Sequence, residues 1–281
     1  MLDGFSAILA NFENWGQGAK QLYGAFLVGS HARESHRADA SSDLDLILVV
    51  DNPAYFLYTD NWLQAIGDFH ISFVEDTFGG QKERRILFDG ALDVDFNILP
   101  RTVFLSLMEQ GVLSIVLGRG YRILVDKMGL QGLLQHAHKD MLADALPTKR
   151  EYENLVHLFW YHTVWAAKKL MRGELWTAKH CVDCYMKEQL LSMVEWHARA
   201  IHGPGFDTWH DGRFLDEWAE GWVIQNLAHC FAHYDNKDIA FALLATMDLF
   251  RTLAVETAQA FGFIYPQQAD TYATFWVSGV I

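Results

Sequence analysis

Two short apolar runs joined by a polar segment constrain this chain more than any other feature of its sequence. The first run, Ala25–Val28, ends in Gly29-Ser30, and the second, Leu46–Val50, directly follows Asp43-Leu44-Asp45. Apolar runs of this length, bounded by polar or turn residues, are typical of buried β-strands. Residues two apart in a strand share a face, so Asp43 and Asp45 are expected to point the same way.

Two carboxylates on one face of a strand repel each other unless a positive charge lies between them. A hard divalent cation relieves this repulsion, and Mg²⁺ held by one or two carboxylates and by substrate phosphates fits best. Gly29-Ser30 at the end of the preceding strand, if it opens a helix, offers backbone N–H groups and a hydroxyl to a phosphate. Taken alone, Asp43-Leu44-Asp45 also fits a solvated turn.

A further strand pair lies downstream. Arg84–Phe88 and Leu92–Leu99 are joined by Asp89-Gly90, a pair that favours a tight hairpin. Alternation places Asp93 and Asp95 on one face of the second strand. Either carboxylate can therefore add to the candidate site, although the two lie nearly 7 Å apart at about 3.3 Å per residue.

A strand-end Gly-Ser, a strand-start Asp-Leu-Asp and a carboxylate on a later strand together resemble the polymerase-β-like nucleotidyltransferase superfamily. The resemblance implies that Asp43, Asp45 and Asp95 are the catalytic and metal-ligating residues. Asp95 is selected over Asp93 because an Asp followed by apolar residues and a proline fits the superfamily pattern there.

The same resemblance implies nucleotide contacts from Gly29, Ser30 and Arg33. The chain departs from its relatives at two positions. His31 follows Ser30 where an arginine is common, and Asp93 stands two residues before Asp95 where a basic residue is frequent.

Composition restricts the partners. The chain has 281 residues and a formal net charge of −13, which argues against binding to nucleic acid and favours a small cationic partner. No apolar run approaches the roughly 20 residues of a membrane helix, and the N-terminus lacks the features of a secretory signal. Three cysteines indicate a reduced, cytoplasmic protein. The sequence leaves the oligomeric state open, with a monomer as the simplest expectation.

The pattern changes near Leu146-Pro147. Strands and glycines precede it, apart from helices expected at Asp3–Trp15, Pro53–Ile66 and Arg101–Gln110. Long helical patterns follow it, and we expect helices at Lys149–Arg172, Leu175–Ile201 and Lys237–Phe261. The sequence predicts an α+β chain, with a mixed-sheet nucleotidyltransferase domain at residues 1–146 and an α-helical bundle domain at 147–281.

The helical half carries a second resemblance, spread over several segments that include Arg172-Gly173-Glu174-Leu175, Leu190–Trp196, Met247–Arg251 and Gly262–Pro266. Together they resemble the aminoglycoside 6-adenylyltransferase (streptomycin adenylyltransferase) family, and the likeness covers nearly the whole chain. It implies that ATP is the co-substrate and Mg²⁺ the cofactor, and that AMP is moved to a hydroxyl of an aminoglycoside.

In such a helical domain Lys187 is expected to meet the triphosphate. Asp183, one helical turn earlier, would pair with Lys187 or receive a cationic substrate group. Two alternatives stay open: the same chemistry on a lincosamide or another small hydroxyl compound, and a non-catalytic nucleotide-binding homologue.

Overall fold

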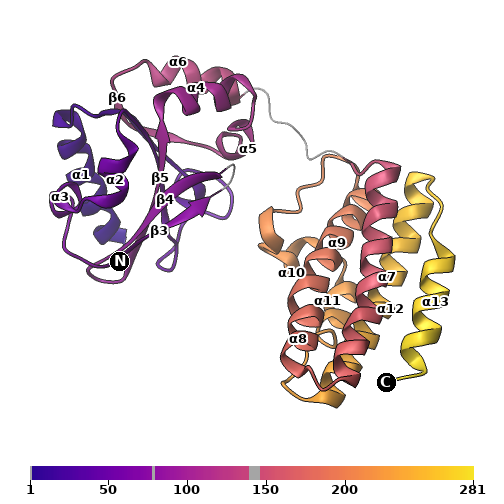
Figure 1. Cartoon of the computed structure of the whole chain (residues 1–281). Coiled ribbons are helices and arrows are strands. Elements are labelled where there is room, and N and C mark those ends of the chain that lie inside the picture. Colours follow the sequence, from indigo (N-terminus) through magenta and orange to yellow (C-terminus); the bar gives the residue numbers. More distant parts are fainter. Residues whose placement is uncertain (1, 78–79, 139–145) are drawn as a thin grey trace. The chain divides into compact units, whose positions relative to one another are not determined.

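The computed structural model describes residues 2–77, 80–138 and 146–281 (Figure 1). The chain divides into two compact units, Met1–Leu142 and Ala143–Ile281. The boundary expected from the sequence, after residue 146, lies four residues beyond this division.

A six-stranded mixed sheet forms the centre of the first unit, in the order β3-β4-β5-β2-β1-β6. Its strands are β1 (Leu22–Val28), β2 (Leu44–Val50), β3 (Phe69–Thr77), β4 (Gln81–Phe88), β5 (Leu92–Pro100) and β6 (Arg122–Asp126). The central pair β2–β5 is parallel, and every other neighbouring pair is antiparallel. The expected hairpin around Asp89-Gly90 joins β4 to β5.

Helices cover both faces of this sheet, with α1, α2 and α3 on one face and α4, α5 and α6 on the other (Figure 1). Their bounds are α1 Leu2–Gly18, α2 Pro53–Tyr58, α3 Asn61–Gln64, α4 Arg101–Glu109, α5 Ser114–Leu117 and α6 Leu130–His138. The predicted helices at the N-terminus and after Pro100 are confirmed.

Strand alternation decides which residues each helical layer covers. On β2, Leu46 and Leu48 pack into the core beneath α1–α3, whereas Ile47 and Val49 pack into the core beneath α4–α6. Asp45 shares the face of Ile47 and Val49 but lies nearer the start of the strand, where the apolar layer of α4–α6 ends. On β2 the fold thus leaves a carboxylate at the start of a face whose later residues, Ile47 and Val49, are apolar.

The single helix expected over Pro53–Ile66 is wrong, because the segment forms the two short helices α2 and α3. Thr59 between them is extended, at φ −118° and ψ 147°. The buried guanidinium of Arg84 donates hydrogen bonds to the carbonyls of Phe56 and Thr59 and pairs with Asp60. Carbonyls at the end of α2 are therefore satisfied by a strand residue instead of by a continuing helix.

The second unit is helical. Its elements are α7 Lys149–Met171, α8 Leu175–His180, the π-helical segment η3 Cys181–Tyr185, α9 Met186–His202, the 3₁₀ turn η4 His210–Gly212, α10 Leu215–Trp218, α11 Gly221–Leu227, α12 Asn236–Phe261 and α13 Gln267–Ser278. The uninterrupted α-helix expected over Leu175–Ile201 is wrong, since η3 divides it into α8 and α9. Among the helices of the described residues, none is both long and apolar enough to cross a membrane.

Candidate active site

Strand register brings the candidate residues into one row across the sheet. Asp95 on β5 lies opposite Asp45 on the parallel strand β2. On the far side of β2, Asp45 lies opposite Val28, the last residue of β1. Neighbouring strands are about 4.8 Å apart, so this register alone makes Asp45 and Asp95 close neighbours.

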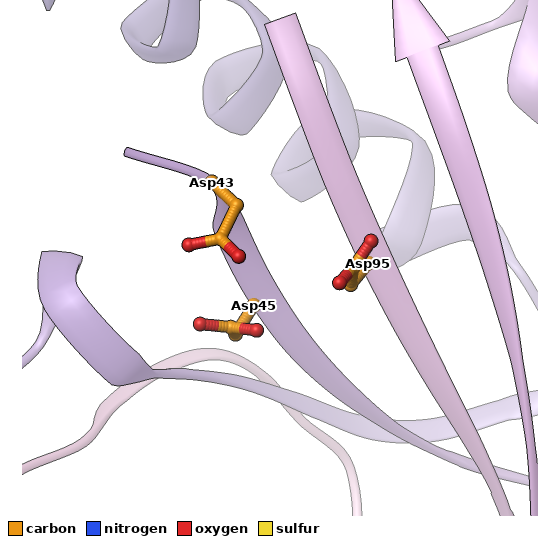
Figure 2. Close-up of side chains that lie close together, drawn as sticks. All are labelled: Asp43, Asp45 and Asp95. Carbon is orange, nitrogen blue, oxygen red and sulfur yellow. The ribbon is translucent and has the colours of Figure 1, made fainter. Parts of the chain in front are cut away.

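Asp43, Asp45 and Asp95 form a carboxylate cluster, in which one oxygen atom from each residue lies within 4.8 Å of the others. Figure 2 shows the three side chains, two from the β2 segment and one from β5. Asp95 is buried, with 3% of its surface exposed, and the other two are half-buried. Asp93, two residues earlier on β5, is exposed.

The two carboxylate oxygens of Asp95 have different surroundings. Oδ2 accepts from Nη2 of Arg85 at 2.8 Å, whereas Oδ1 is buried and has no hydrogen-bond partner among the described residues. Burial raises the pKa of Asp95 to about 7, against the lowering effect of Arg85 and with a further increase from Asp93. A carboxyl group with such a pKa can gain or lose a proton near neutral pH.

This arrangement fits a divalent cation. Three carboxylates supply hard oxygen ligands, which Mg²⁺ prefers. The unpartnered Oδ1 of Asp95 is a buried polar atom that a cation would satisfy. The positive charge would also relieve the repulsion among the three carboxylates.

Gly29 and Ser30 lie beside this cluster, in the 3₁₀ turn η1 (Gly29–His31) that follows β1. Gly29 has φ +68°, and a Cβ at this position would collide with Oδ2 of Asp45, so the close approach requires glycine. The Ser30 hydroxyl lies 3.5 Å from the carbonyl oxygen of Asp43. The expectation that Gly29-Ser30 opens a helix is met only by this single turn.

Arg33 lies just beyond the turn, and its Nε donates to the carbonyl of His36 at 2.6 Å within the same loop. His31 packs its ring edge-on against Phe5, at 5.0 Å between centroids. Burial lowers the pKa of His31. The structure therefore places Gly29, Ser30 and the three aspartates together, with Arg33 in the adjoining loop.

Lys187 and Asp183 belong to the second unit. Nζ of Lys187 donates to the carbonyl of Val182 at 2.7 Å and to Oγ1 of Thr246 at 2.9 Å. Burial lowers the pKa of Lys187 to about 8. Asp183 pairs with Lys179 instead of with Lys187, because the wider π turn changes which side chains lie above one another.

Sequence reasoning missed Arg85, the partner of Asp95. Arg85 stands opposite Asp95 in the β4–β5 ladder. The hairpin signal at Asp89-Gly90 predicted that the two strands pair but not their register. Phe88 pairs with Leu92, so the loop also includes Ala91, whereas a two-residue turn would shift the partner of Arg85 by one residue.

A mixed sheet that gathers a strand-end Gly-Ser and three carboxylates at one place defines a nucleotidyltransferase. Within that class, the family model described as streptomycin adenylyltransferase matches residues 6–280. The chain belongs to this family.

Individual relatives are distant. The chain is 24% identical over 204 residues to an aminoglycoside 6-adenylyltransferase from Staphylococcus aureus, a match covering 68% of each protein. It is 20% identical over 265 residues to the enzyme of that name from Bacillus subtilis (strain 168), covering 90% of this chain and 89% of the relative. A crystal structure of an aminoglycoside 6-adenyltransferase from Bacillus subtilis aligns over 98% of this chain and 96% of its own, with 17% identity and a TM-score of 0.47.

Proposed function

We propose that this protein transfers AMP from ATP to a hydroxyl group of an aminoglycoside in a Mg²⁺-dependent reaction that releases pyrophosphate. The observation that carries the proposal is the cluster of Asp43, Asp45 and Asp95 beside Gly29-Ser30, in a chain of the streptomycin adenylyltransferase family. The names of its relatives support an aminoglycoside as the acceptor.

In the proposed reaction, the acceptor hydroxyl oxygen attacks the α-phosphorus of ATP. A bond forms between these two atoms, and the bond from the α-phosphorus to the oxygen that bridges to the β-phosphorus breaks. Pyrophosphate leaves with the electron pair of that bond. The hydroxyl proton must also be removed, and Oδ1 of Asp95 is a suitable acceptor because it is unpartnered among the described residues.

The other residues bind and orient the reactants. Asp43 and Asp45 would hold Mg²⁺, and Asp95 would either complete this ligand set or take the hydroxyl proton. The ion when bound would supply positive charge to the phosphates. The backbone of η1 and the hydroxyl of Ser30 would contact the triphosphate, with Arg33 adjacent. Positioning and charge neutralisation supply most of the rate enhancement in phosphoryl-transfer chemistry.

In the helical unit, Lys187 is proposed to meet the nucleotide and Asp183 the cationic acceptor. The net charge of −13 supports a cationic acceptor and argues against a nucleic acid. The need for ATP fits the expected cytoplasmic location.

The test is to incubate the protein with ATP, Mg²⁺ and a panel of aminoglycosides and lincosamides, and to search for AMP adducts by mass spectrometry. An adduct on an aminoglycoside supports the proposal, whereas one on a lincosamide alone supports the first alternative. Binding of ATP without any adduct would identify a non-catalytic homologue.

Asp43→Asn and Asp45→Asn serve as controls for this assay. Each replaces one half-buried carboxylate of the cluster with a neutral amide and leaves the apolar core unchanged. We expect transfer to be abolished while the circular dichroism spectrum and melting temperature stay close to those of the wild type. Near-wild-type turnover in either variant would contradict the metal-binding role.

A further inference from the structure

The guanidinium of Arg85 links the carboxylate cluster to two glutamates on the neighbouring strands β3 and β4. Nη2 contacts Oδ2 of Asp95 at 2.8 Å. On its other side, Nε contacts Oε1 of Glu75 on β3 at 2.9 Å and Oε1 of Glu83 on β4 at 3.0 Å. Three neighbouring strands therefore fix one planar group.

This arrangement sets the orientation of the Asp95 carboxylate. Oδ2 is held by Arg85, so Oδ1 is the oxygen left for a cation or a substrate hydroxyl. The rigid fork of a guanidinium can hold a carboxylate and a second anionic partner at fixed angles, which a lysine ammonium cannot do. The two glutamates restrain Arg85 itself, because moving it away from Asp95 would also break their contacts.

Burial makes this anchor necessary. Asp95 has 3% of its surface exposed and Glu83 has 8%, so water can compensate neither charge fully. A buried carboxylate without a partner is costly and would reorient or leave the cluster. Arg85 supplies that partner from β4, whereas Asp45 lies on β2, the other neighbour of β5.

We propose that Arg85, anchored by Glu75 and Glu83, is a positioning residue that holds Asp95 in the orientation needed for cation binding and AMP transfer. The inference about transfer rests on the proposed function, whereas the inference about cation binding does not require transfer to occur. Arg85 itself is not assigned a contact with substrate.

The first experiment compares steady-state kinetics of the wild type, Arg85→Met, Arg85→Lys and Lys82→Met. Lys82→Met is a matched control, since it also removes a cation from β4 and breaks a cross-strand ion pair, the 2.6 Å contact with Asp76. Lys82 lies three residues from Arg85 and hence on the other face of the strand.

We expect kcat of Arg85→Met to fall about tenfold to a hundredfold, the range typical for residues that support metal ligands. The KM for ATP should change little, because Arg85 does not bind the nucleotide in this proposal. Arg85→Lys should recover part of the loss, and Lys82→Met should resemble the wild type. An unchanged kcat in Arg85→Met, or an equal loss in Lys82→Met, overturns the proposal.

The second experiment measures Mn²⁺ binding without nucleotide, by electron paramagnetic resonance of the free ion. We expect the Mn²⁺ dissociation constant of Arg85→Met to rise about tenfold, with Lys82→Met unchanged. An equal or smaller dissociation constant in Arg85→Met overturns the proposal, whatever its activity. If the wild type transfers no AMP, this measurement still decides the role of Arg85, and the proposed function fails separately.

Circular dichroism will establish that each variant is folded. If Arg85→Met does not fold, Glu83→Gln takes its place, because it keeps Arg85 and removes one of its two anchors. Its kcat and Mn²⁺ affinity should both decrease, by less than expected for Arg85→Met. If Glu83→Gln kept the wild-type kcat and the wild-type Mn²⁺ affinity, the proposal would be overturned.

Discussion

Asp93 and Asp95 show how two identical side chains on one strand face acquire different chemistry. Asp95 is buried, is paired with Arg85 through Oδ2 and has a pKa raised by burial to about 7. Asp93 lies two residues earlier and is exposed. A general base or metal ligand must lie within about 3 Å of its target, so these positions are not interchangeable.

We therefore expect Asp95→Asn to lose activity by about a hundredfold or more, as for removal of a general base. Asp93→Asn should keep most of its kcat and at most raise the KM for a cationic acceptor. Steady-state kinetics of the two variants check this ranking. The reverse ranking would mean that the acceptor hydroxyl lies nearer the start of β5.

At the scale of elements, β1, the turn η1 and β2 bring Gly29 and Ser30 beside Asp45. The antiparallel register places Val28 opposite Asp45, so the chain leaves β1 directly beside that carboxylate. Gly29 meets two requirements: the turn needs its positive φ, and the close approach of its backbone to the Asp45 carboxylate leaves no room for a Cβ.

Gly29→Ala and Gly90→Ala separate these two requirements. Both glycines have positive φ, +68° and +76°, but at Gly90 no described atom lies within 4 Å of an added Cβ. Each alanine should cost about 1–2 kcal/mol of stability through backbone strain. Only Gly29→Ala should also displace Asp45, and we expect its kcat to fall by about tenfold or more, as misplaced catalytic groups do.

Chemical denaturation and steady-state kinetics measure the two effects. The structure predicts that Gly29→Ala and Gly90→Ala lose similar amounts of stability and that only Gly29→Ala loses activity. Equal activity in the two variants would show that Asp45 tolerates displacement.

Much of this arrangement could be predicted from the sequence, because the signals are local. Apolar runs and alternation located β1, β2, β4 and β5, and Asp89-Gly90 located the hairpin. Arg85 could not be found in this way, since its role depends on which residue of β5 it faces. Asp183 and Lys179 have the i,i+4 spacing of an ordinary helical ion pair, so their pairing was open to prediction. The division of the helix at η3 was not, because apolar periodicity does not distinguish a π segment from an α-helix.

Lys187, on α9 just after η3, makes the stability of the helical unit depend on pH in a specific way. Burial lowers the pKa of Lys187 in the folded protein to about 8, whereas the pKa of a lysine in the unfolded chain is near 10.4. Between these two pH values the unfolded chain therefore binds more protons than the folded protein. Wild-type stability should therefore rise with pH across this window, by at most about 3 kcal/mol. Below pH 8 the full cost of burying the charge is present.

Lys187→Met removes this titration, so the difference in unfolding free energy between variant and wild type should change steadily between about pH 8 and pH 10. Urea unfolding at several pH values measures it. Lys237→Met, at an exposed position of α12, controls for the loss of one positive charge. If the unfolding free energies of wild type and Lys187→Met changed with pH in parallel, the lowered pKa of Lys187 would be contradicted.

At the scale of the whole molecule, the dominant property is a net charge of −13 on a chain proposed to bind one cationic and one anionic substrate. An acidic protein attracts a polycation over distances comparable with the Debye length and repels ATP over the same range. The two substrates should therefore respond differently to salt.

We expect the KM for an aminoglycoside to rise by about threefold or more between about 20 mM and about 300 mM KCl, as screening weakens the attraction. The KM for ATP should stay level or fall. Initial rates at fixed free Mg²⁺ measure both constants. A parallel rise in the two KM values would indicate a general effect of salt on the enzyme.

The parallel pairing of β2 with β5 also bears on how the protein becomes active as it folds. Asp45 and Asp95 face each other although they are fifty positions apart in the chain, and β3, β4 and the helices α2 and α3 lie between them in sequence. Closing such a large loop is entropically costly, so contacts of this kind form late relative to local helices and hairpins. Enzymatic activity would then return only with the last stage of refolding, after most of the helical circular dichroism signal has recovered.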